Sequence, residues 1–134
     1  MSTAADGKHR GKLWFSDAAD VDRFVEMLGR FERGEIDATA WRRFRLIYGA
    51  YKLEIGPALY FLRVKIPQGI LSADQLEVLA DVASRHSRGF AHVTTRQNVQ
   101  LHCVAQAELE PALRTLAAAG MTTREACGDS VRTV

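Results

Sequence analysis

Apolar residues recur with two different periods in the second half of the chain, and these periods predict its elements. In residues 58–66 the positions alternate, with Tyr60, Leu62, Val64 and Ile66 on one face and Phe61, Arg63 and Lys65 on the other. A period of two is typical of a β-strand. Residues 90–94, 98–104 and 121–127 give three further strands.

Two helical patterns separate these strands. Ser72 followed by Gln75 forms a capping box, which predicts a helix that begins there and continues to Gly89. Its buried stripe is expected to contain Leu76, Leu79, Ala80 and Ala83. A second helix is predicted over Glu108–Ala119, with its leucines facing inward. The order β-α-β-β-α-β predicts an α+β, ferredoxin-like fold with an antiparallel sheet and both helices on one face.

Residues 1–57 are predicted to form an N-terminal arm and a helical lead-in to the ferredoxin-like unit at 58–134. One helix is expected to begin with Ser16 as its N-cap, and another to begin after Asp37. The second helix contains W-R-R-F-R at 41–45, a mixture of basic and aromatic residues that also occurs at nucleic-acid contacts. The spacing of its two aromatic residues favours docking on the body, with the arginines in water. The form of the connection at 48–57 is left open.

The candidate chemistry lies in the stretch H-V-T-T-R-Q-N-V-Q-L-H-C-V at His92–Val104. Alternation places Asn98, Gln100 and His102 on one face, and Val99, Leu101 and Cys103 on the other. If Leu62 and Val64 face the helices, Arg63 and Lys65 share the open face with Gln100 and His102. The opposite register would bury two cations. We therefore expect a donor-rich, cationic face suited to an anionic partner. The alternative is a hairpin whose outer face only meets water.

Composition narrows the function only slightly. The formal net charge of +2 does not by itself indicate nucleic acid or membrane. No apolar run reaches the ~20 residues that span a bilayer, and the polar first residues do not resemble a secretory signal. A cytoplasmic protein is therefore expected. Cys103 and Cys127 indicate neither a disulfide framework nor a C-x-x-C metal site, so no metal ligands are predicted in this chain.

Three spaced segments resemble a known family. They are Y-F-L-R-V-K-I-P-Q-G at Tyr60–Gly69, T-T-R-Q-N-V-Q-L-H at Thr94–His102 and A-C-G-D-S-V-R-T-V at Ala126–Val134. Together they resemble the first ferredoxin-like half-domain of the sirohaem-dependent nitrite and sulfite reductases. W-R-R-F-R and Y-G-A-Y are similar to that family's lead-in. The resemblance covers roughly residues 35–134, and three motifs in the expected order argue against a chance match.

The resemblance implies a part in the six-electron reduction of nitrite to ammonia or of sulfite to sulfide. In that family, sirohaem is bridged to a [4Fe-4S] cluster by a cysteine thiolate. The catalytic residues that reach the substrate would be Arg63 and Arg132. The residues that hold the cofactor or line its site would be Thr94, Thr95, Arg96, Gln100 and His102. Arginine suits this task because its fork binds carboxylates in bidentate fashion and stabilises an oxyanion.

The chain also departs from the family. The family's catalytic lysine pair and its four cluster-binding cysteines lie in a later domain, beyond Val134, and Cys103 and Cys127 lack the spacing of cluster ligands. Thr133 stands where Asn is common, and Cys103 where an aromatic residue is frequent. We expect an N-terminal fragment or a stand-alone remnant that is inactive alone. It would need the remaining reductase domains and an electron donor such as ferredoxin or a flavoprotein.

Two other functions are compatible with the predicted fold. One is a binding or regulatory module without redox activity, and the other is a structural remnant without a ligand. RNA recognition on such a sheet relies on stacked aromatic residues. The candidate positions offer Arg63, Gln100 and His102, and Phe61 is assigned to the other face, so RNA is the poorer fit.

Overall fold

Two aspartates begin the N-terminal helices in the computed structural model, which describes residues 16–53, 58–66, 70–87, 91–93 and 98–124. Asp17 caps α2 (Ala18–Glu32), and its Oδ1 accepts a hydrogen bond from the Ala19 N–H at 2.9 Å. Asp37 caps α3 (Ala38–Ile47) in the same way, through the Ala40 N–H. The prediction of Ser16 as an N-cap was wrong, because its hydroxyl donates to the Ala117 carbonyl instead.

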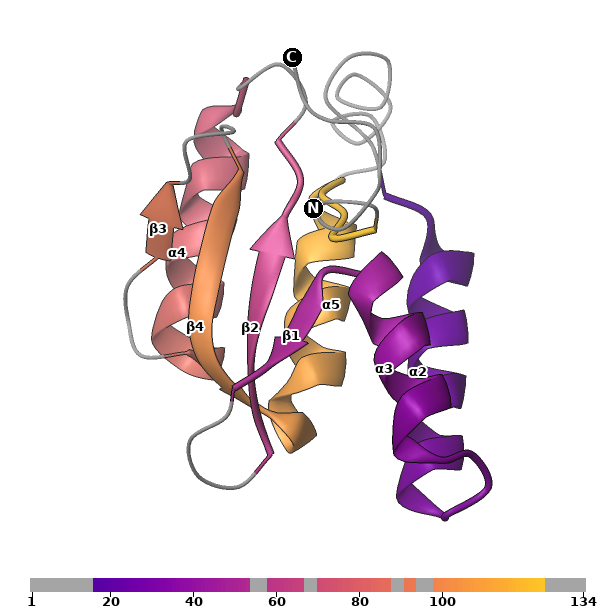
Figure 1. Cartoon of the computed structure of the whole chain (residues 1–134). Coiled ribbons are helices and arrows are strands. Elements are labelled where there is room, and N and C mark those ends of the chain that lie inside the picture. The colour runs from indigo at the N-terminus through magenta and orange to yellow at the C-terminus, as the bar shows by residue number, and fades with distance from the viewer. Residues whose placement is uncertain (1–15, 54–57, 67–69, 88–90, 94–97, 125–134) are drawn as a thin grey trace.

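Four strands form one antiparallel sheet in the order β1-β2-β4-β3 (Figure 1). They are β1 (Ala50–Lys52), β2 (Leu59–Val64), β3 (Ala91–Val93) and β4 (Val99–Ala105). Three of the predicted strands are therefore confirmed. The fourth strand was expected at 121–127, but it is β1, from the connection whose form was left open. Of that predicted strand, the described residues contribute one isolated bridge, between Lys65 and Thr122.

Gly49 lies at one edge of β2, where β1 and the segment after helix α5 (Leu109–Ala118) each pair with a different part of that strand. The Arg63 N–H donates to the Gly49 carbonyl at 2.9 Å, and the Lys65 N–H donates to the Thr122 carbonyl at 2.8 Å. Gly49 has a φ of +73°, and a Cβ placed on it would lie 2.7 Å from the Thr123 carbonyl oxygen. Only glycine fits this conformation and this close approach without strain.

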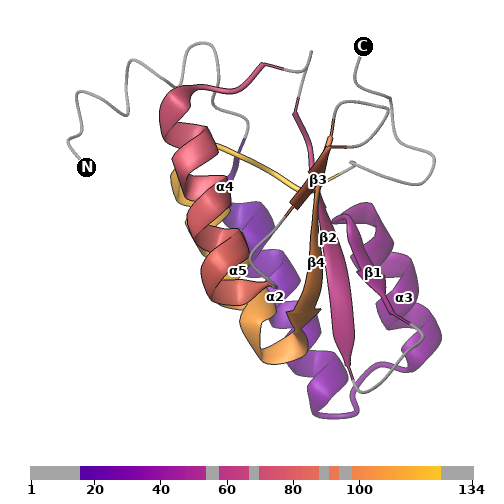
Figure 2. The ribbon, with the colours of Figure 1, turned by 90° about the vertical axis from the view of Figure 1, so that its left-hand side faces the viewer.

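The two helices of the ferredoxin-like unit lie on one side of the sheet, as predicted (Figure 2). These are α4 (Ala73–His86) and α5 (Leu109–Ala118), which follows the short 3-10 helix η2 (Gln106–Glu108). The N-terminal α2 packs against α5, and α3 packs against β1. On the opposite face, no helix of the described residues covers β2 and β4, and α3 lies beyond the β1 edge of the sheet (Figures 1 and 2). The predicted layer arrangement is therefore confirmed for these helices.

The capping box of α4 is confirmed, but its buried stripe differs from the prediction. Ser72 Oγ accepts from the Gln75 N–H, and Gln75 Oε1 accepts from the Ser72 N–H, both at 3.1 Å. The buried residues of α4 are Gln75, Leu79, Val82 and Ala83. Leu76 is 60% exposed and Ala80 is exposed, contrary to expectation. The stripe therefore runs through Val82 and begins with a glutamine.

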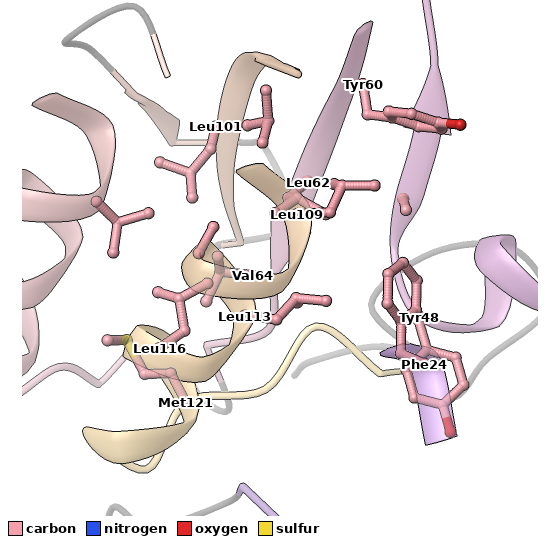
Figure 3. Packing of buried hydrophobic residues seen from close by; sticks show 14 of the residues in the cluster. Phe24, Tyr48, Tyr60, Leu62, Val64, Leu101, Leu109, Leu113, Leu116 and Met121 are labelled. Atoms are coloured by element: carbon pink, nitrogen blue, oxygen red, sulfur yellow. The ribbon is translucent and has the colours of Figure 1, made fainter. Parts of the chain in front are cut away.

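A single apolar core joins the N-terminal helices to the sheet. In Figure 3, Leu62 and Val64 of β2 lie beside the α5 leucines, and Phe24 and Tyr48 extend the cluster at its other end. Trp41 is buried and its indole N–H donates to the Tyr60 hydroxyl at 3.2 Å, so the aromatic docking of α3 is confirmed. Arg45, expected in water, is 7% exposed and donates to the Ala50 carbonyl.

Candidate functional site

The open face of the sheet carries the polar residues that the alternation assigned to it. Arg63 of β2 and Gln100 of β4 are direct partners in the antiparallel register. Their neighbours Leu62, Val64 and Leu101 are fully buried on the opposite face. Arg63, Gln100 and His102 are half-buried. The prediction that these three side chains share a face away from the helices is therefore confirmed.

Gln100 holds the Arg63 guanidinium. With the amide oriented so that its oxygen faces Arg63, this oxygen accepts from Nη2 at 2.6 Å and from Nε at 3.2 Å. Arginine has five N–H donors, so this contact leaves several of them to meet another acceptor. Among the described residues, no carboxylate forms an ion pair with Arg63. The charge of Arg63 is therefore oriented by a neutral partner, and no described carboxylate neutralises it.

Two aromatic rings lie beside these polar groups. Tyr51 of β1 and Phe61 of β2 stack with ring centroids 4.8 Å apart and an interplanar angle of 9°. The Arg63 Cζ lies 5.4 Å from the centroid of the Tyr51 ring, and the Phe61 and His102 ring centroids are 5.8 Å apart. We call this set the open-face cluster. It consists of Tyr51, Phe61, Arg63, Gln100 and His102.

The alternation of residues 58–66 placed Phe61 on the face of Arg63, which is confirmed, so the argument against RNA that assigned Phe61 to the other face was wrong. Phe61 lies two residues before Arg63 on the same strand, so the period of two already places both on one face. Tyr51 was missed for a different reason. Its three-residue strand is too short to show alternation, and it is recognised only through its pairing with β2.

A β-bulge shapes the far end of the cluster. Tyr60 pairs with Val104 and Leu62 with Leu101, so His102 and Cys103 together face Phe61. Cys103 has a φ of +58°, and the burial pattern shifts by one residue after it. Val104 is fully buried and Cys103 is only half-buried, contrary to the predicted alternation. Regular alternation from Gln100 places the His102 ring on the open face beside Phe61, and the bulge returns Val104 to the buried face.

The remaining predicted site residues divide into two groups. Asn98 was expected on the open face, but it is 4% exposed and its Oδ1 accepts from the Ile66 N–H at 3.1 Å. Its observed contact is therefore structural. The other group consists of Thr94, Thr95, Arg96 and Arg132, which lie outside the described residues.

Additional cations border the cluster at Tyr51. A hollow of about 380 Å³ between α3 and β1 is lined by Arg42, Arg45, Leu46, Tyr51 and Lys52. Arg42 and Lys52 are exposed. In the described part of the chain, no group of three or more His, Cys, Asp or Glu side chains is placed to hold a metal ion. Likewise, none of its helices is long and apolar enough to cross a membrane.

Comparison with known proteins identifies the family. A family model described as the nitrite/sulfite reductase ferredoxin-like half domain matches residues 51–119. The sulfite reductase [NADPH] hemoprotein beta-component of Oceanobacillus iheyensis is 29% identical over 113 residues, which are 84% of this chain and 18% of that protein. The ferredoxin–nitrite reductase of Leptolyngbya laminosa is 33% identical over 87 residues, 64% of this chain and 17% of that protein.

A solved structure has a similar fold over most of this chain. The Mycobacterium tuberculosis NirA protein superimposes with a TM-score of 0.62 at 27% sequence identity, over 82% of this chain and 26% of that one. The chain thus spans about a fifth of the length of the curated relatives it matches. The matched region contains the open-face cluster from Tyr51 to His102. The chain belongs to the nitrite/sulfite reductase ferredoxin-like half-domain family.

Proposed function

We propose that the open face binds an oxyanion and the carboxylates of sirohaem as the N-terminal part of a nitrite or sulfite reductase. The observation that carries this proposal is Arg63, whose guanidinium is oriented by Gln100 on a face of β2 and β4 that no described helix covers. An arginine fixed by a neutral amide keeps its full charge for an incoming anion. Arg63 is accordingly assigned to the substrate.

The donors of the open face fit a group that carries many carboxylates. Gln100 and His102 are half-buried and lie on the same face of β4 beside β2. They can donate directional hydrogen bonds to a carboxylate, in addition to the attraction of the Arg63 charge. The family resemblance adds Thr94, Thr95 and Arg96 to the cofactor site and Arg132 to the substrate. When bound, sirohaem with a [4Fe-4S] cluster supplies the redox chemistry of the six-electron reduction. The cluster ligands would come from the remaining reductase domains.

Arg63 has two tasks in this proposal. It binds nitrite or sulfite as an anion, and it stabilises the negative charge that develops as N–O or S–O bonds break. Holding the guanidinium in place beforehand removes the need to order it during the reaction. This chain is expected to be inactive alone, because the electrons must arrive from a donor such as ferredoxin or a flavoprotein through the cluster, whose ligands we assign to the remaining reductase domains.

One observation favours a second function, the binding of single-stranded nucleic acid. Tyr51 and Phe61 place stacked aromatic rings on the open face, beside Arg63 and near the exposed Arg42 and Lys52. Aromatic rings and cations on a sheet are a common platform for unpaired bases. The two rings are already stacked on each other, which leaves less of their faces for bases. We therefore keep this function second.

Binding of sirohaem to the purified chain, followed by the change in haem absorbance, tests the proposal. Arg96→Ala is expected to weaken binding roughly 10- to 100-fold, because a shielded charge-assisted contact contributes ~1.5–3 kcal/mol. Arg63→Gln should spare sirohaem affinity and weaken sulfite binding. Arg43→Ala removes an exposed arginine of α3 and is the control.

Each outcome of this titration has a clear meaning. Equal sirohaem affinity in all variants, or no binding by the unmodified chain, would contradict the proposal. A labelled single-stranded oligonucleotide serves as the competing ligand. Tight oligonucleotide binding that Phe61→Leu abolishes, without any sirohaem binding, would establish the second function instead.

A further inference from the structure

We propose that Tyr51 is a positioning residue for Arg63, so that a ring from the lead-in strand prepares the anion site of the ferredoxin-like unit. The proposal rests on the proposed function for its purpose, but the contact itself is a property of this chain. Tyr51 lies outside the motifs that marked Arg63 and Gln100 in the sequence, and it comes from a strand that the sequence did not predict.

The register of the sheet brings Tyr51 to Arg63. Tyr51 is the direct partner of Phe61 across β1 and β2, and Arg63 is two residues further along β2 on the same face. The two rings stack at 4.8 Å, and the Arg63 Cζ lies 5.4 Å from the Tyr51 centroid. A guanidinium this close to a ring centroid is within the range of cation–π attraction.

Tyr51 is itself held from the other side of β1. The buried Arg45 of α3 donates from Nη1 to the Ala50 carbonyl at 2.8 Å. Gly49 carries the left-handed turn that starts the strand, and its carbonyl accepts from the Arg63 N–H. The backbone on which Tyr51 stands is therefore fixed both to α3 and to the strand of Arg63.

Two neutral partners thus define the position of one cation. The Gln100 amide binds the guanidinium edge, and the Tyr51 ring contacts the same group. An arginine side chain is long and rotamer-rich, so fixing it before the anion arrives reduces the entropy lost on binding. Neither partner carries a negative charge. The arrangement orients Arg63 without competing with an oxyanion for its charge, as a carboxylate partner would.

Two variants separate positioning from general packing. Tyr51→Phe keeps the ring and its stacking while removing the hydroxyl, whereas Tyr51→Leu removes the ring and keeps an apolar side chain. The first readout is the Nε–Hε resonance of Arg63 in a ¹⁵N-edited NMR spectrum, assigned from its loss in Arg63→Gln. We expect a ring-shifted, motionally restricted signal in the unmodified chain and in Tyr51→Phe. In Tyr51→Leu this signal should move toward the chemical shift of a free arginine, and its relaxation should report a mobile guanidinium.

The second readout is titration with sulfite, followed at backbone amides of β2 and β4. Tyr51→Leu is expected to weaken binding roughly fivefold, within the range of one cation–π contact, and Tyr51→Phe less than twofold. If sulfite leaves every spectrum unchanged, the proposed function fails, yet the Arg63 signal still decides the positioning. An Arg63 Nε–Hε signal that is identical in folded Tyr51→Leu and in the unmodified chain would overturn the inference.

Discussion

A single glycine determines how the edge of β2 is divided between two segments of the chain. Gly49 adopts a φ of +73°, and a Cβ there would meet the Thr123 carbonyl oxygen at 2.7 Å and the Arg63 carbonyl oxygen at 2.8 Å. Both contacts are with backbone atoms, which cannot rotate away. The residue therefore allows β1 and the segment after α5 to approach β2 together, and it places Tyr51 two residues later on the open face.

Gly49→Ala and Gly34→Ala are a matched pair of substitutions that tests the close packing at Gly49. Gly34 has a similar φ of +78°, but a Cβ on it would meet nothing within 4 Å. We expect Gly34→Ala to cost about 1–2 kcal/mol of unfolding free energy, from the left-handed conformation alone. Gly49→Ala should cost at least ~2 kcal/mol more, because the backbone must also shift. Urea midpoints measure both, and equal midpoints would contradict the close packing at Gly49.

The polar residues of the open face were predictable wherever strict alternation held. Arg63 and Gln100 follow the period of two and were assigned correctly. Alternation failed at Cys103, because a bulge adds a residue to β4 and reverses the faces beyond it. It failed at Asn98 as well, because this residue precedes β4 and turns inward to bind the Ile66 N–H. Neither feature has a residue signal as clear as a glycine or a proline.

Helix α4 shows how hydrogen bonding can override apolarity in selecting a buried face. Gln75 is 5% exposed, because its Oε1 accepts from the Ser72 N–H and its Nε2 donates to the Ala119 carbonyl at 3.1 Å. Gln75, the second member of the capping box, thus also connects the start of α4 to the end of α5. Leu76 borders the buried stripe in the first turn and stays 60% exposed. A pattern based on hydrophobicity ranks these two residues in the opposite order.

Leu76→Ala and Leu79→Ala test this face with the same chemical change on one helix. Leu79 is 4% exposed, so its truncation should cost about 2–5 kcal/mol through lost burial and a residual cavity. The exposed Leu76 should lose less than about 0.5 kcal/mol when truncated. Denaturant unfolding followed by circular dichroism gives both values. A larger loss of unfolding free energy for Leu76→Ala than for Leu79→Ala would show that Leu76 lies in the buried stripe, as expected from the sequence.

At the scale of the whole molecule, the lead-in contributes a strand as well as helices. The ferredoxin-like order predicted β2, α4, β3, β4 and α5, since each has its own periodic pattern. It did not predict β1, because the edge of β2 beside it can accept either of two segments. The division of the chain at residue 57 stays a prediction. The core that joins both sides suggests that they unfold together.

Phe24→Ala, a substitution in the lead-in part of the core, tests whether the lead-in and the sheet unfold together. Phe24 on α2 is fully buried, with its ring centroid 5.5 Å from that of Trp41 and 5.6 Å from that of Tyr48. Its truncation should cost about 3–5 kcal/mol. If the chain unfolds as one unit, hydrogen exchange of the Leu62 and Leu101 amides in the sheet should accelerate by the same factor as that of the α2 amides.

The matched change for Phe24→Ala is Leu113→Ala on α5, a 5% exposed residue of the other part of the chain. In a single cooperative unit, the two variants should lower protection throughout the sheet and α2, each in proportion to its own loss of stability. If Phe24→Ala accelerated exchange in α2 and α3 alone and left the sheet amides protected, the lead-in would be a separately unfolding unit. Tyr51 would then connect two such units, and opening of the lead-in would release the ring that positions Arg63.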